Sequence, residues 1–397
     1  MKNKTQLTAL LIGLLIASLV ALPVLAVVPV EPTYIQDPAD IITVDGDTSD
    51  WDLTEDYFAD MYKAANPNFE VLSKLYLRYD CTTFTLYALV LVESGHTIDA
   101  DLLPDEHYLK VGSTTLVDDT DQPADGTPPD FHWVGLSGDG TTAEGWEAST
   151  ELWPGEYTNF NVHTDVDDGE TSAVTNRSID LTLICWDLGD LPDTYPTSWS
   201  GTSDGPRHQI GNLWLGDFID AEYNGIPTST CDGDDLDHTN NDEDGVVRTG
   251  DWSVGTNGAQ IRVDVTGGTG YLFGWIDWNE NGTFDTGEMV LNNVALGTGA
   301  HLLNFDVPSS VDFNTEPTLC TRFRLYGESQ SSATPWGEAV NGEVEDYCWD
   351  FGANAVTMIS LSAGADNRSS ITLALAATLM TVGVLGVRVL RRRNSLN

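Results

Sequence analysis

Apolar and polar residues alternate with a period of two through most of the chain between residues 34 and 351. The polar stretch at residues 80–83 separates two alternating runs, which is typical of two strands joined by a tight turn. Further runs, bounded by Gly, Pro, Asp or Asn, lie at residues 145–152, 159–166, 178–186, 260–265, 271–278, 301–307 and 320–326. No long stretch follows the helical period instead, so the pattern predicts an all-β protein.

Composition divides these runs into two groups. Residues 191–211 are rich in Pro, Ser, Thr and Gly, and such a stretch between periodic segments is typical of a linker. We therefore expect two β-sandwich-like domains in tandem, one over residues 34–190 and one over residues 212–351.

Two apolar segments flank these domains. A short basic start, an apolar run and small residues before position 27 indicate a secretory signal peptide over residues 1–26, with an uncleaved anchor helix as the alternative. An uncharged apolar run followed by four arginines indicates a transmembrane anchor over residues 371–390 and a basic cytoplasmic tail over residues 391–397. A sorting tail that is later processed is the other interpretation. We expect an exported cell-surface protein held in the membrane by this C-terminal helix.

Charge restricts the partners. The chain has 62 acidic against 17 basic residues and a formal net charge of −45. Nucleic-acid binding needs a basic surface that attracts phosphate, so this composition argues against nucleic acid as a partner.

Residues 277–288 form the strongest chemical motif. Oxygen-bearing side chains stand at positions 1, 3, 5, 9 and 12, and Gly282 stands at position 6, as in the calcium loop of an EF-hand. Thr283 would contribute its backbone carbonyl at position 7. The predicted calcium ligands are Asp277, Asn279, Asn281, Thr283, Asp285 and Glu288. Because strand-like runs flank the loop, we expect it in a β context; a polar hairpin turn without an ion is the alternative.

A second acidic segment covers residues 231–245. Its carboxylates would repel one another strongly unless cations neutralise them. The candidate ligands are Asp232, Asp234, Asp235, Asp242 and Asp244. A calcium-binding loop and a solvated acidic loop are both compatible with this composition.

Five cysteines are present, and none forms a CxxC pair, which argues against a zinc ribbon or a thioredoxin-like site. Domain order would pair Cys81 with Cys185 and Cys320 with Cys348. Cys231 would then be left over.

The second domain resembles the GEVEDY domain of bacterial surface proteins. The sequence GEVEDY itself occupies residues 342–347, and matching motifs precede it in order near residues 215–222, 233–235, 242–246, 275–288 and 321–324. The resemblance covers about residues 212–350 and implies a secreted, β-rich surface module without a known catalytic role. From the residues alone, we expect Glu343, Glu345 and Asp346 to face Arg322 and Arg324 across neighbouring strands as a structural ladder of ion pairs.

The first domain begins with a motif, residues 42–52, that resembles the opening of family-nine-like carbohydrate-binding and DOMON-type sandwiches. This resemblance implies that tryptophan rings could stack on sugars; Trp51, Trp133, Trp146 and Trp153 are the candidates. In a sandwich, such rings are more often part of the core.

Enzyme motifs are weak. None of the seven histidines lies in an HExxH sequence, and the formal GxSxG at residues 201–205 lies in the polar stretch, without the strand and helix that a nucleophile elbow requires. We expect a non-catalytic surface protein with a structural, adhesive or ligand-presenting role and a calcium-stabilised module. Carbohydrate binding by the first domain is the alternative, and a secreted hydrolase is the third.

Overall fold

The fold is all-β, as predicted. The computed structural model describes residues 31–36, 40–100, 106–167, 169–174, 178–200, 203–233, 242–315 and 317–351. Their regular elements are strands and two 3-10 turns, Thr48–Asp50 and Phe313–Thr315. In this part of the chain no helix has the length and apolar character needed to span a membrane. The expected signal peptide, C-terminal anchor and basic tail lie outside the described residues.

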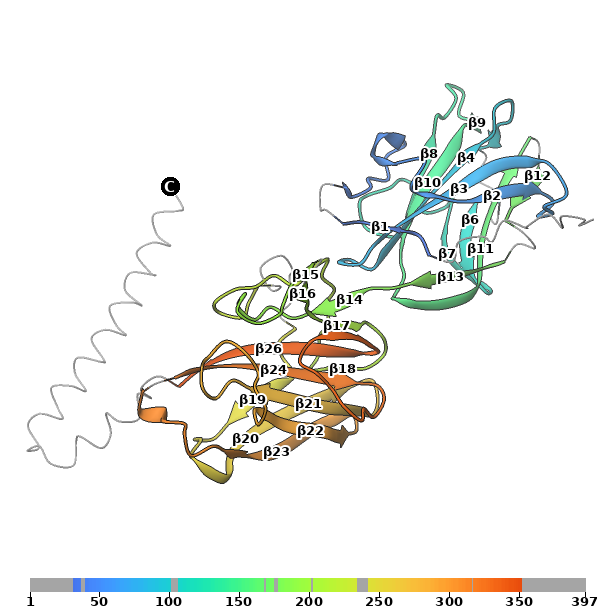
Figure 1. The fold of residues 1–397 in the computed structure, drawn as a ribbon. Coiled ribbons are helices and arrows are strands. Elements are labelled where there is room, and N and C mark those ends of the chain that lie inside the picture. Colours follow the sequence, from blue (N-terminus) through green and yellow to red (C-terminus); the bar gives the residue numbers. More distant parts are fainter. Residues whose placement is uncertain are drawn as a thin grey trace, which may run out of the picture. The chain divides into compact units, whose positions relative to one another are not determined.

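The chain divides into two compact units, Met1–Ile184 and Cys185–Asn397. The strands of the first unit form one hydrogen-bonded sheet in the order β7-β6-β11-β12-β2-β3-β4-β10-β8, to which the other four attach (Figure 1). Its strands are β1 (Thr33–Tyr34), β2 (Tyr57–Lys63), β3 (Val71–Asp80), β4 (Thr85–Val92), β5 (Ile98–Asp99), β6 (Tyr108–Val111), β7 (Thr114–Asp118), β8 (Asp130–Val134), β9 (Thr142–Ala143), β10 (Gly145–Glu151), β11 (Gly155–Val166), β12 (Glu170–Ala173) and β13 (Ile179–Leu183).

The predicted strand–turn–strand in this unit is the hairpin of β3 and β4, which pair in antiparallel register from Ser73–Val92 to Asp80–Thr85. The Asp80 carboxylate closes the turn because it accepts hydrogen bonds from the Thr82 amide and from the Thr83 hydroxyl. Such side-chain bonds to the local chain are the reason that Asp favours turns.

Two four-stranded sheets form a sandwich in the second unit. One contains β18, β19, β20 and β23, and the other has the order β22-β21-β24-β26. Apolar residues of both sheets, among them Ile261, Val263, Leu272 and Phe323, form the core between them. The strands are β14 (Trp186–Leu188), β15 (Trp199–Ser200), β16 (Ser203–Asp204), β17 (Pro206–Gln209), β18 (Trp214–Leu215), β19 (Val246–Thr249), β20 (Gly255–Thr266), β21 (Gly270–Ile276), β22 (Met289–Leu296), β23 (Gly299–Val307), β24 (Thr318–Tyr326), β25 (Gly337–Val340) and β26 (Gly342–Asp350).

The interpretation of residues 191–211 as a linker is wrong. This segment contains β15, β16 and β17, and β17 pairs with both β14 and β25 in a further sheet of the second unit. The second unit therefore begins at Cys185 rather than at residue 212. The reason lies in β21 and β24, whose outer faces carry Phe273, Trp275 and Arg322, side chains that are buried and so need a covering layer.

Candidate metal centre

The predicted calcium loop, residues 277–288, joins the antiparallel strands β21 and β22. Its first residue, Asp277, is fully buried. One carboxylate oxygen accepts the Asn281 amide at 3.2 Å, and the other accepts the Gly282 amide at 2.8 Å and the Tyr195 hydroxyl at 2.6 Å. The chain turns sharply here, and Gly282 has a φ of +81°, a conformation that costs glycine little.

Four of the six predicted ligands converge in this loop. The side-chain nitrogens of Asn279 and Asn281 both donate to Asp285 Oδ2, at 3.4 and 2.7 Å, and Asn279 also donates to Glu288 Oε1 at 3.0 Å. Rotating the Asn279 amide by half a turn would present its oxygen to the same space, because the two ends of an amide have the same shape. The side-chain oxygen of Asn281 accepts hydrogen bonds from the backbone amide and from the hydroxyl of Thr283.

The electrostatics of the loop favour a cation. Burial raises the pKa of Glu288, and the negative charges of Asp277 and Asp285 raise it further, whereas hydrogen bonds from two backbone amides lower it. The protein therefore holds like charges close together in a half-enclosed place. A hard divalent cation would relieve this repulsion and needs the oxygen ligands that the loop supplies.

The described members of the second predicted cluster, Asp232, Asp242 and Asp244, do not form one group of ligands. Asp232 accepts the hydroxyls of Thr228 and Thr230 within its own turn, which lowers its pKa. Asp244 accepts the amide of Asp217 at 3.0 Å. Asp242 instead lies among other buried carboxylates, and Asp234 and Asp235 lie outside the described residues.

The predicted disulfide between Cys320 and Cys348 is wrong. These cysteines are directly opposite each other on β24 and β26, with their sulfurs 3.4 Å apart, but Cys348 is bonded to Cys231 and Cys320 is a free thiol. Cys231, in the loop that precedes β19, lies close enough to bond to the Cys348 sulfur. The spacing of the cysteines in the sequence does not show that Cys348 has this second possible partner. The other predicted pair, Cys81 with Cys185, stays a prediction.

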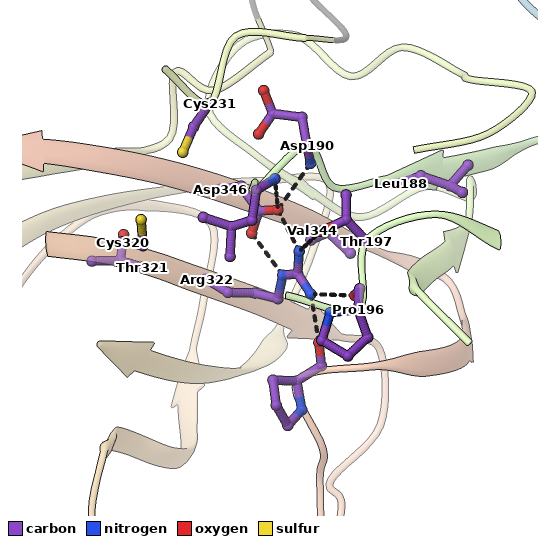
Figure 2. Close-up of polar contacts among 12 residues, drawn as sticks. Leu188, Asp190, Pro196, Thr197, Cys231, Cys320, Thr321, Arg322, Val344 and Asp346 are labelled. Atoms are coloured by element: carbon purple, nitrogen blue, oxygen red, sulfur yellow. Dashed lines mark hydrogen bonds and ion pairs between the residues drawn. The ribbon is translucent and has the colours of Figure 1, made fainter. Parts of the chain in front are cut away.

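The acidic side chains on the two faces of β26 have different kinds of partner. On the outer face, Asp346 forms a two-pronged ion pair with Arg322, at 2.7 and 2.6 Å, and also accepts the amides of Asp190 and Leu191 (Figure 2). All of these contacts are buried. Arg324, the next outward residue of β24, bonds to backbone carbonyls and His208.

On the inner face, Glu343, Glu345 and Tyr347 bind backbone amides of the opposite sheet. Glu343 accepts the amide of Leu215 on β18, Glu345 accepts the Gly245 amide at 2.6 Å, and the Tyr347 hydroxyl accepts the Val246 amide at 3.1 Å. Burial raises the pKa of Glu345 to about 8. The expected ladder is therefore right for Asp346 and wrong for the two glutamates, which join the sheets instead.

Two buried acidic side chains near β26 were not predicted as site residues from the sequence. Asp187 on β14 accepts the Val344 amide at 2.6 Å, and Glu222, in the loop after β18, accepts the Leu188 amide at 2.7 Å. Both are buried. The available signal was weak: each acid stands among apolar residues in a short run, where a solvated acid is uncommon.

Three of the four candidate tryptophans of the first unit are buried. Trp51, Trp133 and Trp146 have exposed fractions of 6%, 5% and 0%, whereas Trp153 is 41% exposed and packs on Phe84 with ring centroids 4.4 Å apart. The first three rings belong to the core, and Trp153 is the candidate that could meet a ligand.

Together these features define an all-β protein whose second unit is built around an acidic, doubly hydrogen-bonded edge strand. The family model described as the GEVED domain matches residues 271–350, which confirms the resemblance over that segment. No curated protein and no solved structure matches the chain.

Proposed function

We propose that this chain is a non-catalytic, exported surface protein whose second unit is a structural module stabilised by calcium. The GEVED match, the all-β fold and the signal and anchor segments expected from the sequence support this proposal. The module would present a rigid surface for adhesion or for a ligand, and the C-terminal anchor would hold it at the membrane.

The convergence of Asn279, Asn281, Asp285 and Glu288 carries the calcium part of the proposal. Side-chain oxygens at this spacing suit an ion that takes six to eight hard ligands. Two of the ligands are neutral amides, so we expect the weak affinity of extracellular modules, roughly 0.1–1 mM. Bound calcium would then fix the turn between β21 and β22.

Thermal unfolding of the full chain tests this proposal. The metal-stripped protein should gain about 1.4 kcal/mol in unfolding free energy at calcium ten times above Kd, seen as a rise in Tm. The double variant Asp277→Ala/Glu288→Gln should lose the increase in unfolding free energy that comes from calcium bound at this loop. The control Asp251→Ala/Glu328→Gln, which removes two exposed acids of the same unit, should keep it. An equal rise in the loop variant and in the control would refute the loop site.

Carbohydrate binding by the first unit is the second candidate function. The exposed Trp153 ring, supported by Phe84, is the observation that favours it, because sugar faces are apolar and pack on aromatic rings.

A further inference from the structure

Five carboxylates, none of them from the loop of residues 277–288, gather at the edge strand β26. Asp187, Asp242 and Glu343 offer oxygens that all lie within 4.8 Å of one another, and all three residues are buried. Asp220, Glu222 and Asp242 form a second such group, so Asp242 belongs to both. The residues come from β14, the loop after β18, the turn before β19, and β26.

Two of these side chains present a buried oxygen that has no hydrogen-bond partner. Glu343 is fully buried; the Leu215 amide binds its Oε2, and its Oε1 has no partner. Glu222 is 6% exposed; the Leu188 amide binds its Oε2, and its Oε1 lacks a donor. An ionised oxygen removed from water without a donor is costly, so a cation or a proton must compensate for it.

The arginines within residues 185–351 are engaged elsewhere. Residues 185–351 contain no lysine and five arginines. Arg322 pairs with Asp346, Arg262 with Asp264, and Arg207 with Asp204 and Glu338. Arg248 donates to the carbonyl of Asp350, and Arg324 donates to carbonyls and to His208.

We propose that this cluster binds a divalent cation of the calcium type, held by Asp187, Asp242 and Glu343, with Asp220 and Glu222 as further oxygen donors. Oxygens that share one calcium ion at about 2.3–2.6 Å lie up to about 5 Å apart, which fits the observed grouping. Magnesium keeps several of its waters, so a buried, all-carboxylate site suits calcium better.

The ion would connect the outer layer of the second unit to its sandwich. Asp187 already binds the edge of β26 through the Val344 amide, and Glu343 binds β18 from the same strand. One cation between these carboxylates joins β14, β26 and the turn before β19. The first glutamate of the GEVEDY sequence thereby becomes a metal ligand as well as a bridge between sheets.

Shared protons are the competing explanation. Burial and the neighbouring carboxylates raise the pKa of Glu343 and of Glu222 well above the ordinary value, so both could be neutral in the absence of an ion. Glutamine keeps the shape of a protonated glutamate but lacks the negative charge that would hold the ion in this buried cluster. Glu343→Gln therefore separates the two explanations: it abolishes ion binding if the cluster holds calcium.

The experiment counts calcium bound to the full chain after equilibrium dialysis, by elemental mass spectrometry. All variants are made in a protein that carries Asp277→Ala/Glu288→Gln, so the loop of residues 277–288 cannot contribute bound calcium. The difference in bound calcium between this background and the unaltered protein tests the loop site separately. We expect this background to retain one calcium ion per chain. Adding Glu343→Gln should lose it, and adding the matched control Glu328→Gln, an exposed glutamate, should keep it.

Two results would overturn the site: a loop-variant background that binds no calcium, or retention of the ion after Glu343→Gln. If Glu343→Gln does not fold, the background count still decides whether an ion is bound. Glu222→Gln then serves as the second variant, and it should weaken calcium binding by at least about tenfold. Unchanged affinity in Glu222→Gln would remove Glu222 from the proposed site.

Discussion

Both units are acidic, but they neutralise their buried carboxylates in different ways. In the first unit, Asp56 is bonded to Arg78, and Glu147 accepts the amides of Asp45 and Gly46 and the Trp51 indole. Both of these acids have fixed donors from the chain. The second unit has the same arrangement at Asp346, and it also collects carboxylates around Asp242.

This difference suggests two kinds of stability. A carboxylate paired with arginine has a partner that the chain itself supplies, so its contribution does not depend on calcium. Carboxylates gathered around a shared space depend on what the solution provides, because a cation or proton must join them. The first unit should therefore be indifferent to calcium, whereas the second should respond to it.

The largest expected effect comes from breaking a fixed pair. Arg322→Met and Arg78→Met each leave a buried carboxylate without its cation, and each should cost about 3–5 kcal/mol in unfolding free energy. Arg262→Met removes a partly exposed pair with Asp264 and should cost less than about 1 kcal/mol. Denaturant unfolding of the three variants measures the contrast. Equal losses in all three would contradict the distinction between fixed buried pairs and surface pairs.

A pH dependence of the first unit is the next effect in size. Burial raises the pKa of Glu147 from 4.5 to about 7. The folded protein then binds a proton more tightly than the unfolded chain, so this stabilisation is full below about pH 4.5 and is lost as the pH rises toward 7. The loss is at most about 3 kcal/mol.

Denaturant unfolding at several pH values, with Glu147→Gln beside the unaltered protein, measures this effect. The unaltered protein should lose stability relative to the variant between pH 4.5 and 7. Glu156→Gln, an exposed glutamate on β11, is the control and should follow the unaltered protein. Parallel curves for Glu147→Gln and the unaltered protein would show that Glu147 does not titrate in this window.

The smallest effect concerns the exposed ring. Trp153→Ala should cost about 1 kcal/mol or less, because the ring loses its contact with Phe84 but little buried area. Trp146→Ala, in the core, should cost about 3–5 kcal/mol. A glycan array probed with both proteins then sharpens the comparison: binding lost in a folded Trp153→Ala variant supports a sugar platform, and unchanged binding removes this ring from it.

Local patterns were enough to predict much of the fold. Alternation places β3, β4, β20, β21 and β24 where the sequence indicates strands, because burial on a sheet requires a period of two. The loop of residues 277–288 was also visible, since its residues are neighbours in sequence. The GEVEDY residues could be located from the sequence. Their side chains point alternately to the two faces of β26, and the sequence did not show which residues each face contacts.

The remainder depended on contacts between distant segments. Asp187 and Glu343 are far apart in the chain, and no local pattern shows that β14 lies beside β26. The same limit explains the errors at Cys231 and at residues 191–211. At residues 191–211, composition suggested a linker because short strands such as β17 carry too few residues to show a period.

The bond between Cys231 and Cys348 has a mechanical consequence. These cysteines are 117 residues apart, and the segment that they enclose contains most strands of the sandwich. A pull applied to the two ends of the chain would pass through the sulfur atoms and leave the enclosed strands unloaded. A protease that cuts one loop inside the enclosed segment would likewise release no fragment, because both pieces stay joined through this covalent link.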